Sequence, residues 1–258
     1  MNSAFGNNNK MNNQVLFTPE QYKSMRESYC YCDRDCTFEV CTTPNLNSRF
    51  VGKYIGIFSK SVPDHYRLGI NLRRFELIIQ AVFVDAELSE SNGNINIAHI
   101  ENLKAIICAV VHWKMASQGG RADKNVANVK KKWRDDTFSQ LISAYRKKDL
   151  ALFKIGGVRI PTATAFLRFL FPDECGIMDS RVAKVTQKNG ITQLDIRDDG
   201  YIIDKKKNEE QYNQKYNPFL VNEALQINCS GITFQDTDEQ GEQINFKFRP
   251  CDVEMALF

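Results

Sequence analysis

The segment from Lys154 to Val185 (KIGGVRIPTATAFLRFLFPDECGIMDSRVAKV) contains the residues whose types and spacing most directly suggest chemistry. Gly156 and Gly157 stand between the end of one predicted helix and Pro161, which suits the first turn of the next. Glycine adopts the positive φ that a tight turn needs, and it lets a ligand approach the main chain. The exposed N–H groups of such a hairpin would form a small anion site. The alternative is an ordinary connection between two helices, because short glycine turns are common.

Asp179 stands at the start of the following predicted helix, and its position allows two interpretations. As an N-cap, its carboxylate would accept from the N–H of Arg181 or Val182, an interaction worth about 1 kcal/mol. As a catalytic group, a carboxylate held in a dry pocket would stabilise positive charge that develops in a transition state. The two roles are compatible, because capping would orient the carboxylate.

The hairpin and the aspartate together resemble the helix-hairpin-helix DNA glycosylase superfamily, in particular its endonuclease III branch. The family pattern is Leu-Pro-Gly-Val-Gly, a variable pair, Thr-Ala, an apolar helix, a loop, and an aspartate-led entrance to the next helix. In this chain Ile155–Val158 occupies the hairpin, Thr162-Ala163 the helix start and Met178–Val185 the aspartate-led entrance. When the segment from the hairpin to the aspartate is laid against the endonuclease III branch, the two align without a gap. The helices predicted from Asn71 to Lys148 agree with the family's helical lead-in by pattern alone.

The resemblance implies a mainly α, two-lobed fold with small β elements near the two ends. It implies a monofunctional DNA glycosylase that flips a modified or mismatched base and hydrolyses its N-glycosidic bond. Asp179 would stabilise the oxocarbenium-like sugar cation and help to place water. The Schiff-base lysine of bifunctional family members falls on Pro161, which has no amine, so no AP-lyase activity is expected. The second hairpin glycine of the family is Arg159 here, and an arginine suits a site beside a phosphate.

Basic residues are concentrated between Lys114 and Arg134, where seven stand against a single acid, Asp123, for a net charge of +6 in a chain of net charge +3. Such a run is usually a solvated helix face. Beside a phosphate-binding hairpin it becomes a strip along a nucleic-acid backbone, which 146–148 would extend. The residues that we expect to contact double-stranded DNA are Gly156, Gly157, Val158, Arg159, Thr162, Lys154, Arg181, Lys114 and Arg121.

His112 and Trp113 close a long predicted helix near the cleft where an extruded base would sit. The Trp113 ring would stack on that base or fill the vacated duplex; the alternative is a core aromatic. Lys114 would be a phosphate contact or an amine outside the family's usual place. We expect the stretch 195–201 and the tyrosines Tyr212 and Tyr216 either to lie over this cleft or only to pack within the protein.

Cys30, Cys32, Cys36 and Cys41 form the only dense cysteine cluster. Four thiolates are able to hold zinc, but structural zinc sites normally show paired C-x₂₋₄-C knuckles, so reduced thiols are the expected state. The three histidines have no spacing typical of a metal site. We therefore expect that no cofactor is required.

The composition limits the class of protein to which the chain can belong. At 258 residues, 43% hydrophobic and 25% charged, the chain is one large domain that can bury a core. Eight cysteines are too sparse for a disulfide scaffold, and no apolar run is long enough for a bilayer. The first residues lack the basic-then-apolar order of a secretory signal. We expect an intracellular monomer, in the cytoplasm and nucleoid or in a nucleus.

Three parts are expected along the chain: a disordered Asn-rich tail (1–14), an N-terminal extension (15–70), and a glycosylase-like domain with a C-terminal extension (71–258). Thr18 and Gln21 predict a capping box at the first helix. Hydrophobic periodicity predicts further helices from 71, over 97–116, 121–133, 136–147, 161–171, 179–188, 211–227 and 250–258. Short strands are predicted at 38–40 and 54–58, and a hairpin at 232–234 and 244–248.

Two other functions remain compatible with these residues. One is a non-catalytic DNA- or RNA-binding protein that keeps the hairpin without the chemistry. The other is an unrelated helical enzyme or interaction domain with a chance glycine turn. An acid that faces the sugar distinguishes the enzyme from the binder, and steeply salt-dependent duplex binding separates both from the third.

Overall fold

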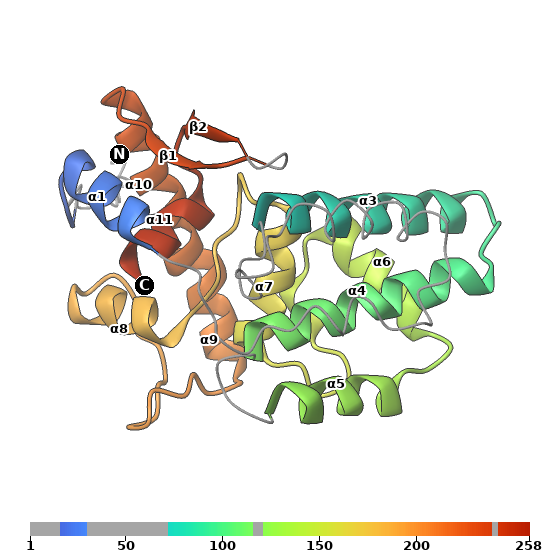
Figure 1. The fold of residues 1–258 in the computed structure, drawn as a ribbon. Helices are drawn as coiled ribbons and strands as arrows, with labels where there is room; N and C mark the ends of the chain where they lie inside the picture. Colours follow the sequence, from blue (N-terminus) through green and yellow to red (C-terminus); the bar gives the residue numbers. More distant parts are fainter. Residues whose placement is uncertain (1–15, 30–71, 116–120, 239–241) are drawn as a thin grey trace, which may run out of the picture.

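A computed structural model describes residues 16–29, 72–115, 121–238 and 242–258 (Figure 1). This part of the chain is mainly helical and contains a small two-stranded antiparallel sheet, as the sequence predicts. No helix within it is long and apolar enough to cross a membrane. The Asn-rich segment 1–14, the N-terminal cysteine cluster and the strands predicted at 38–40 and 54–58 lie outside the described residues.

The first helix, α1 (Pro19–Ser28), begins at the predicted capping box. The Thr18 hydroxyl accepts from the Gln21 N–H at 3.3 Å, and the Gln21 side chain accepts from the Thr18 N–H at 2.8 Å. This satisfies N–H groups that helix ends otherwise leave unpaired. α1 packs against α11 (Pro250–Leu257) at the other end of the chain (Figure 1). The segment that we expected to be an extension thus contributes a helix to the C-terminal group.

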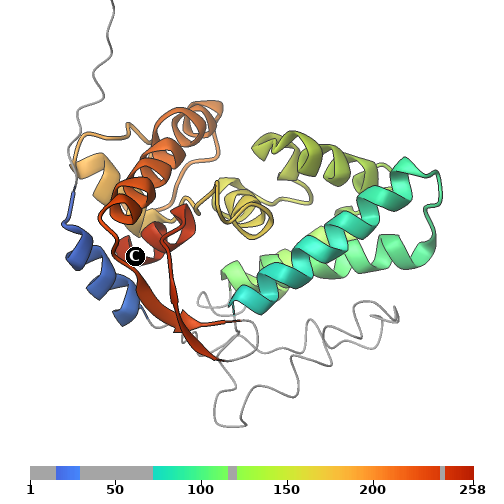
Figure 2. The same ribbon diagram turned by 90° about the horizontal axis from the view of Figure 1, so that it is seen from above.

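Four helices form one side of the molecule (Figure 2). The pattern-based predictions of all four are confirmed, with ends shifted by a residue or a few. α4 packs against both α3 and α5, and most of its side chains are buried. The four are α3 (Leu72–Ser91), α4 (Ile97–Met115), α5 (Arg121–Lys132) and α6 (Thr137–Lys147).

The hairpin leads into α7 (Ile160–Leu170), which lies between the two sides of the molecule (Figure 2). A 3₁₀ turn at Leu150–Phe153 precedes it. α7 packs against α3 and α4, and fully buried Ala163 and Ala165 keep it slim enough to do so. A short loop connects it to α8 (Ser180–Lys188). The hairpin and Asp179 therefore lie at opposite ends of a single buried helix and its loop.

The predicted helix over 211–227 is helical throughout, but it is not one uniform α-helix. The chain forms α9 (Lys206–Gln211), a π-helical turn (Tyr212–Tyr216) and α10 (Asn217–Cys229). Pro218 explains the break, because proline lacks an N–H and crowds the preceding turn. The hairpin that follows pairs β1 (Phe234–Thr237) with β2 (Gln243–Phe246), with Phe234 opposite Phe246.

Buried charges join elements that are distant in sequence. Arg168 on α7 and Arg249 before α11 each reach Glu76 on α3, with N–O distances of 2.6 and 2.8 Å. Arg26 on α1 lies 3.3 Å from Asp252 on α11. Burial alone would raise the pKa of Asp252, but Arg249 and Arg26 hold it below its ordinary value. This network ties the two sides of the molecule together.

Candidate functional site

The hairpin adopts the glycine-dependent turn that the sequence predicts. Gly156 and Gly157 have φ values of +57° and +90°, a region that favours glycine. A Cβ on Gly156 would lie 2.8 Å from the Val129 Cα of α5, so this glycine is also needed for packing. Gly157 is open, with the Lys132 Nζ 3.9 Å from the place of its Cβ. The first glycine thus seats the hairpin on α5, and the second faces outward.

Only part of the hairpin presents free donors. The N–H groups of Gly157 and Arg159 donate to no acceptor within the described chain. The Val158 N–H donates to the Ile155 carbonyl at 2.7 Å, and the Thr162 N–H to the Arg159 carbonyl at 2.9 Å. Val158 and Thr162 are also buried. The predicted phosphate contacts by the N–H groups of Val158 and Thr162 are therefore corrected, whereas the Gly156 N–H, like those of Gly157 and Arg159, donates to no acceptor among the described residues.

Asp179 caps α8 and pairs with a residue from the opposite side of the molecule. Its Oδ1 accepts from the Arg181 N–H at 2.9 Å, which confirms the predicted N-cap. Its Oδ2 lies 2.9 Å from the Lys114 Nζ at the end of α4. Burial alone would raise the pKa of Asp179, but the Lys114 charge and these hydrogen bonds bring it below its ordinary value. The carboxylate is therefore ionised at neutral pH, and Lys114 is an ion-pair partner rather than a free phosphate contact.

The loop before Asp179 is braced by the C-terminal extension. The Tyr216 hydroxyl donates to the Ile177 carbonyl at 2.6 Å, and the Tyr212 hydroxyl to the Gly176 carbonyl at 2.9 Å. Both tyrosines are essentially inaccessible to solvent. Of the two roles left open for these tyrosines, packing beneath the loop is the one observed. They fix the backbone from which the Asp179 carboxylate projects.

Glu254 on α11 adds a second carboxyl group that the sequence did not indicate. It is 4% exposed and forms no hydrogen bond or ion pair with the described residues. Burial raises its pKa to about 8; the positive Lys114 opposes this rise and the negative Asp179 adds to it. At neutral pH the site therefore holds an ionised carboxylate beside a protonated carboxylic acid. The signal in the sequence was a lone acid in the otherwise apolar run VEMALF.

The predicted basic strip is shorter than expected. Lys154 is paired with Asp204 at 2.9 Å and Glu209 at 2.5 Å, so it is no longer a free DNA contact. Arg146 and Lys148 likewise pair with glutamates, whereas Lys147 of the same expected extension is exposed and forms no ion pair with the described residues. Other cations of the strip and its surroundings are exposed. These are Arg121, Lys124, Lys130, Lys131, Lys132, Arg134, Arg159 and Arg181.

Trp113 and His112 belong to the core and not to a base pocket. Trp113 is 6% exposed and meets the Phe169 ring edge-on, with ring centroids 4.8 Å apart. His112 is also buried, and its Nε2 lies 3.8 Å from Asp123 Oδ1. The structure therefore favours the core role for Trp113. The base-pocket interpretation failed because the helical pattern of the sequence does not show that both α3 and α5 pack against α4.

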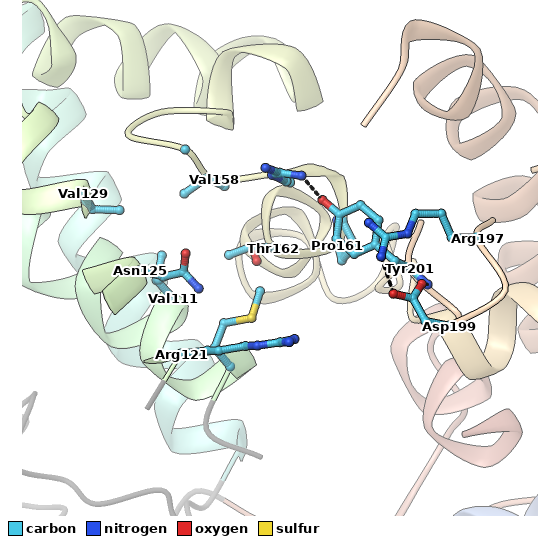
Figure 3. A pocket seen from close by; sticks show the side chains of 13 residues that line it. Val111, Arg121, Asn125, Val129, Val158, Pro161, Thr162, Arg197, Asp199 and Tyr201 are labelled. Carbon is cyan, nitrogen blue, oxygen red and sulfur yellow. Dashed lines mark hydrogen bonds and ion pairs between the residues drawn. The ribbon is translucent and has the colours of Figure 1, made fainter. Parts of the chain in front are cut away.

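A pocket of about 340 Å³ opens beside the hairpin (Figure 3). Arg121 and Asn125 of α5 line one side, and Pro161 at the start of α7 lines another. The third side is Tyr201, whose hydroxyl accepts a hydrogen bond from the Arg159 guanidinium. Arg197, Asp199 and Tyr201 of the stretch 195–201 thus line this pocket.

No cluster of three or more histidine, cysteine or acidic side chains in the described ranges is arranged to hold a metal ion. Comparisons with protein-family models, with curated proteins and with solved structures find no significant match.

Proposed function

We propose that the protein is a monofunctional DNA glycosylase of the helix-hairpin-helix type, with its site in the cleft between the two helical groups. The observation that carries the proposal is Asp179, ionised and largely buried at the start of α8, in register with the glycine hairpin and paired with Lys114 from across the cleft. An ionised carboxylate in a partly dry cleft is suited to stabilise a cation. The resemblance supplies the identity of that cation, a deoxyribose ring.

In this proposal the target nucleotide is extruded from the duplex and its sugar lies against Asp179. The C1′–N bond breaks with its electron pair moving to the base, and the sugar acquires positive charge that the carboxylate offsets. Water then adds to C1′, and the proton that it releases balances the negative charge of the departing base. Lys114 keeps Asp179 ionised and oriented through this sequence.

The exposed donors beside the cleft support a DNA backbone as the ligand. Gly157 and Arg159 offer N–H groups at the hairpin, and the Lys132 ammonium lies close to the turn. Backbone N–H groups and a guanidinium together suit one phosphate. The lysines of α5 would follow the neighbouring phosphates.

One observation favours the alternative of a non-catalytic nucleic-acid-binding protein. Both oxygens of Asp179 are already engaged, one in the cap and one with Lys114. A purely structural aspartate would show the same contacts. The two functions share the hairpin and differ only in whether base is released.

The test is a panel of duplex oligonucleotides, each with one modified or mismatched base, incubated with the protein and then treated with alkali to cleave abasic sites. The proposal predicts alkali-dependent cleavage at the modified position of at least one duplex. Binding of every duplex without release from any would establish the non-catalytic alternative.

The absence of lyase activity is tested on a duplex with a preformed abasic site in the presence of borohydride. Because Pro161 offers no amine, we expect intact strands and no covalent adduct. Lys114 is the ammonium that the structure places at Asp179. A borohydride-trapped adduct that is lost in Lys114→Gln would show a Schiff base and overturn the monofunctional assignment.

A further inference from the structure

The pocket beside the hairpin has walls of different chemistry (Figure 3). Part of its lining is apolar and comes from Val111, Met115 and Val129. Asn125 is half-buried and its amide projects toward the open space, where it finds no partner among the described residues. The Tyr201 ring closes the side opposite α5.

Tyr201 is held in place from the side of the hairpin. Its hydroxyl is hydrogen-bonded to Arg159, and the Arg159 and Arg197 guanidinium carbons lie 5.5 and 5.1 Å from its ring centroid. Such contacts restrain an aromatic ring at little further entropic loss. Tyr201 is therefore a preformed wall and not a loose side chain.

The size and polarity of the pocket suit one planar heteroaromatic ring. A volume of about 340 Å³ lies at the small end of the range of ligand pockets, which suits a small ligand or one unit of a larger one. A side-chain amide donates and accepts side by side, as the edge of a nucleobase does. The apolar part of the lining and the aromatic wall would contact the rest of the ring.

The arginines that line the pocket favour a ligand with negative charge. Arg197 is paired with Asp199, but Arg159 forms no ion pair within the described chain. Arg159 is exposed, and it lines the pocket together with the outward-facing Gly157. A nucleotide would match both the ring-sized pocket and the arginine, because its base is a planar ring and its sugar carries a phosphate.

We propose that this pocket receives the nucleobase of a single nucleotide, with the Asn125 amide reading the edge of the base, Tyr201 contacting the ring and Arg159 contacting its phosphate. The inference rests on the proposed function and names the residues that would set its base preference. Asn125 and Tyr201 lie outside the segment that resembles a known family, so base recognition is assigned here to parts particular to this chain.

The experiment measures binding of the four deoxynucleoside 5′-monophosphates by saturation-transfer NMR with the full chain. At least one should bind, and Asn125→Leu, which keeps the size of the side chain, should weaken it roughly tenfold. Tyr201→Leu should weaken it similarly. Tyr201→Phe keeps the ring and should retain most of the binding. Asn94→Leu, on an exposed loop far along the chain, is the matched control and should change nothing.

The same variants are then tested on the duplex panel, which separates the two proposals. Nucleotide binding that depends on Asn125, without base release from any duplex, leaves the pocket in place and refutes the glycosylase. Base release with unchanged preference in Asn125→Leu and Tyr201→Leu refutes the pocket and leaves the glycosylase. Equal nucleotide signals in the wild type and all variants also overturn the pocket assignment.

Discussion

At the scale of single residues, two largely buried carboxyl groups have pKa values that are shifted in opposite directions. The pKa of Asp179 is lowered because Lys114 and the Arg181 N–H outweigh the effect of burial. Glu254 has no hydrogen-bond or ion-pair partner among the described residues, and burial raises its pKa to about 8. Pairs of acids whose pKa values are driven apart by their surroundings are typical of sites that perform acid–base chemistry.

Glu254→Gln should stabilise the protein at alkaline pH. The ordinary pKa of a glutamate is 4.5 and that of folded Glu254 is about 8, so the folded state loses stability as the pH rises through this range. Glutamine stays neutral and removes this loss. The melting temperature of the variant should exceed that of the wild type at pH 8, and the two should converge toward pH 4.5.

A difference in melting temperature that is the same at both pH values would contradict the assigned burial of Glu254. Glu210→Gln is the matched control, because the Glu210 side chain is 54% exposed. Its effect should not depend on pH over the same range.

The two hairpin glycines should respond differently to substitution. Gly156→Ala places a Cβ against the α5 backbone, so the melting temperature should fall strongly. Gly157→Val has space but must adopt a positive φ, at a strain of about 1–3 kcal/mol. We expect it to weaken duplex binding more than it affects folding. Fluorescence anisotropy with a labelled duplex measures the binding.

Gly93→Val separates backbone strain from the loss of a phosphate site. Gly93 also has a positive φ, +65°, and nothing lies near the place of its Cβ. This variant should carry similar strain and bind duplex DNA as the wild type does. Equal binding by Gly157→Val would remove the hairpin from the proposed DNA contact.

At the scale of elements, positioning of the site depends on parts that the resemblance does not cover. The loop that ends at Asp179 is anchored by hydroxyl groups of the π-helical turn, and Pro218 is the reason for that turn. An extension with no recognised pattern is thus needed to hold the carboxylate.

Tyr216→Phe should separate positioning of Asp179 from DNA binding. The variant leaves the Ile177 carbonyl without its donor, which should destabilise the fold by about 1–3 kcal/mol. Small displacements of a reacting group reduce rate steeply, so base release should fall at least roughly tenfold while duplex affinity is unchanged. Tyr145→Phe, whose hydroxyl has no hydrogen-bond partner in the described structure, is the control. Release that stays at the wild-type rate in Tyr216→Phe would contradict the bracing role.

The sequence predicted elements better than contacts between them. Amphipathic spacing located α3 to α6, and the residue types at Thr18 and Asp179 predicted two helix caps that are present. The pairing of Lys114 with Asp179 was not predicted, because it depends on how α4 and α8 meet across the cleft. Trp113 was misplaced for the same reason: a pattern shows that a face is apolar without showing how many neighbours cover it.

At the scale of the whole molecule, α7 lies between the two helical groups (Figures 1 and 2), and the Lys114–Asp179 ion pair joins the end of α4 to the start of α8. Arg121 of α5 and Arg159 of the hairpin are exposed and line the pocket. In the proposed function this surface binds a polyanion, and one unit of the polyanion lies against the Asp179 carboxylate. The central claim is that this carboxylate acts in a reaction and is not only a helix cap.

Asp179→Asn tests that claim most directly, measured as the single-turnover rate of base release from a duplex that the panel identifies as a substrate. Asparagine keeps an oxygen that can cap α8 and remains beside Lys114, so the protein should stay folded and bind duplex DNA at least as well. It removes the negative charge that faces the sugar cation. We expect a fall in rate on the order of 10²–10³, about 3–4 kcal/mol of barrier. Release at the wild-type rate would show that Asp179 is a structural cap and would contradict the catalytic assignment.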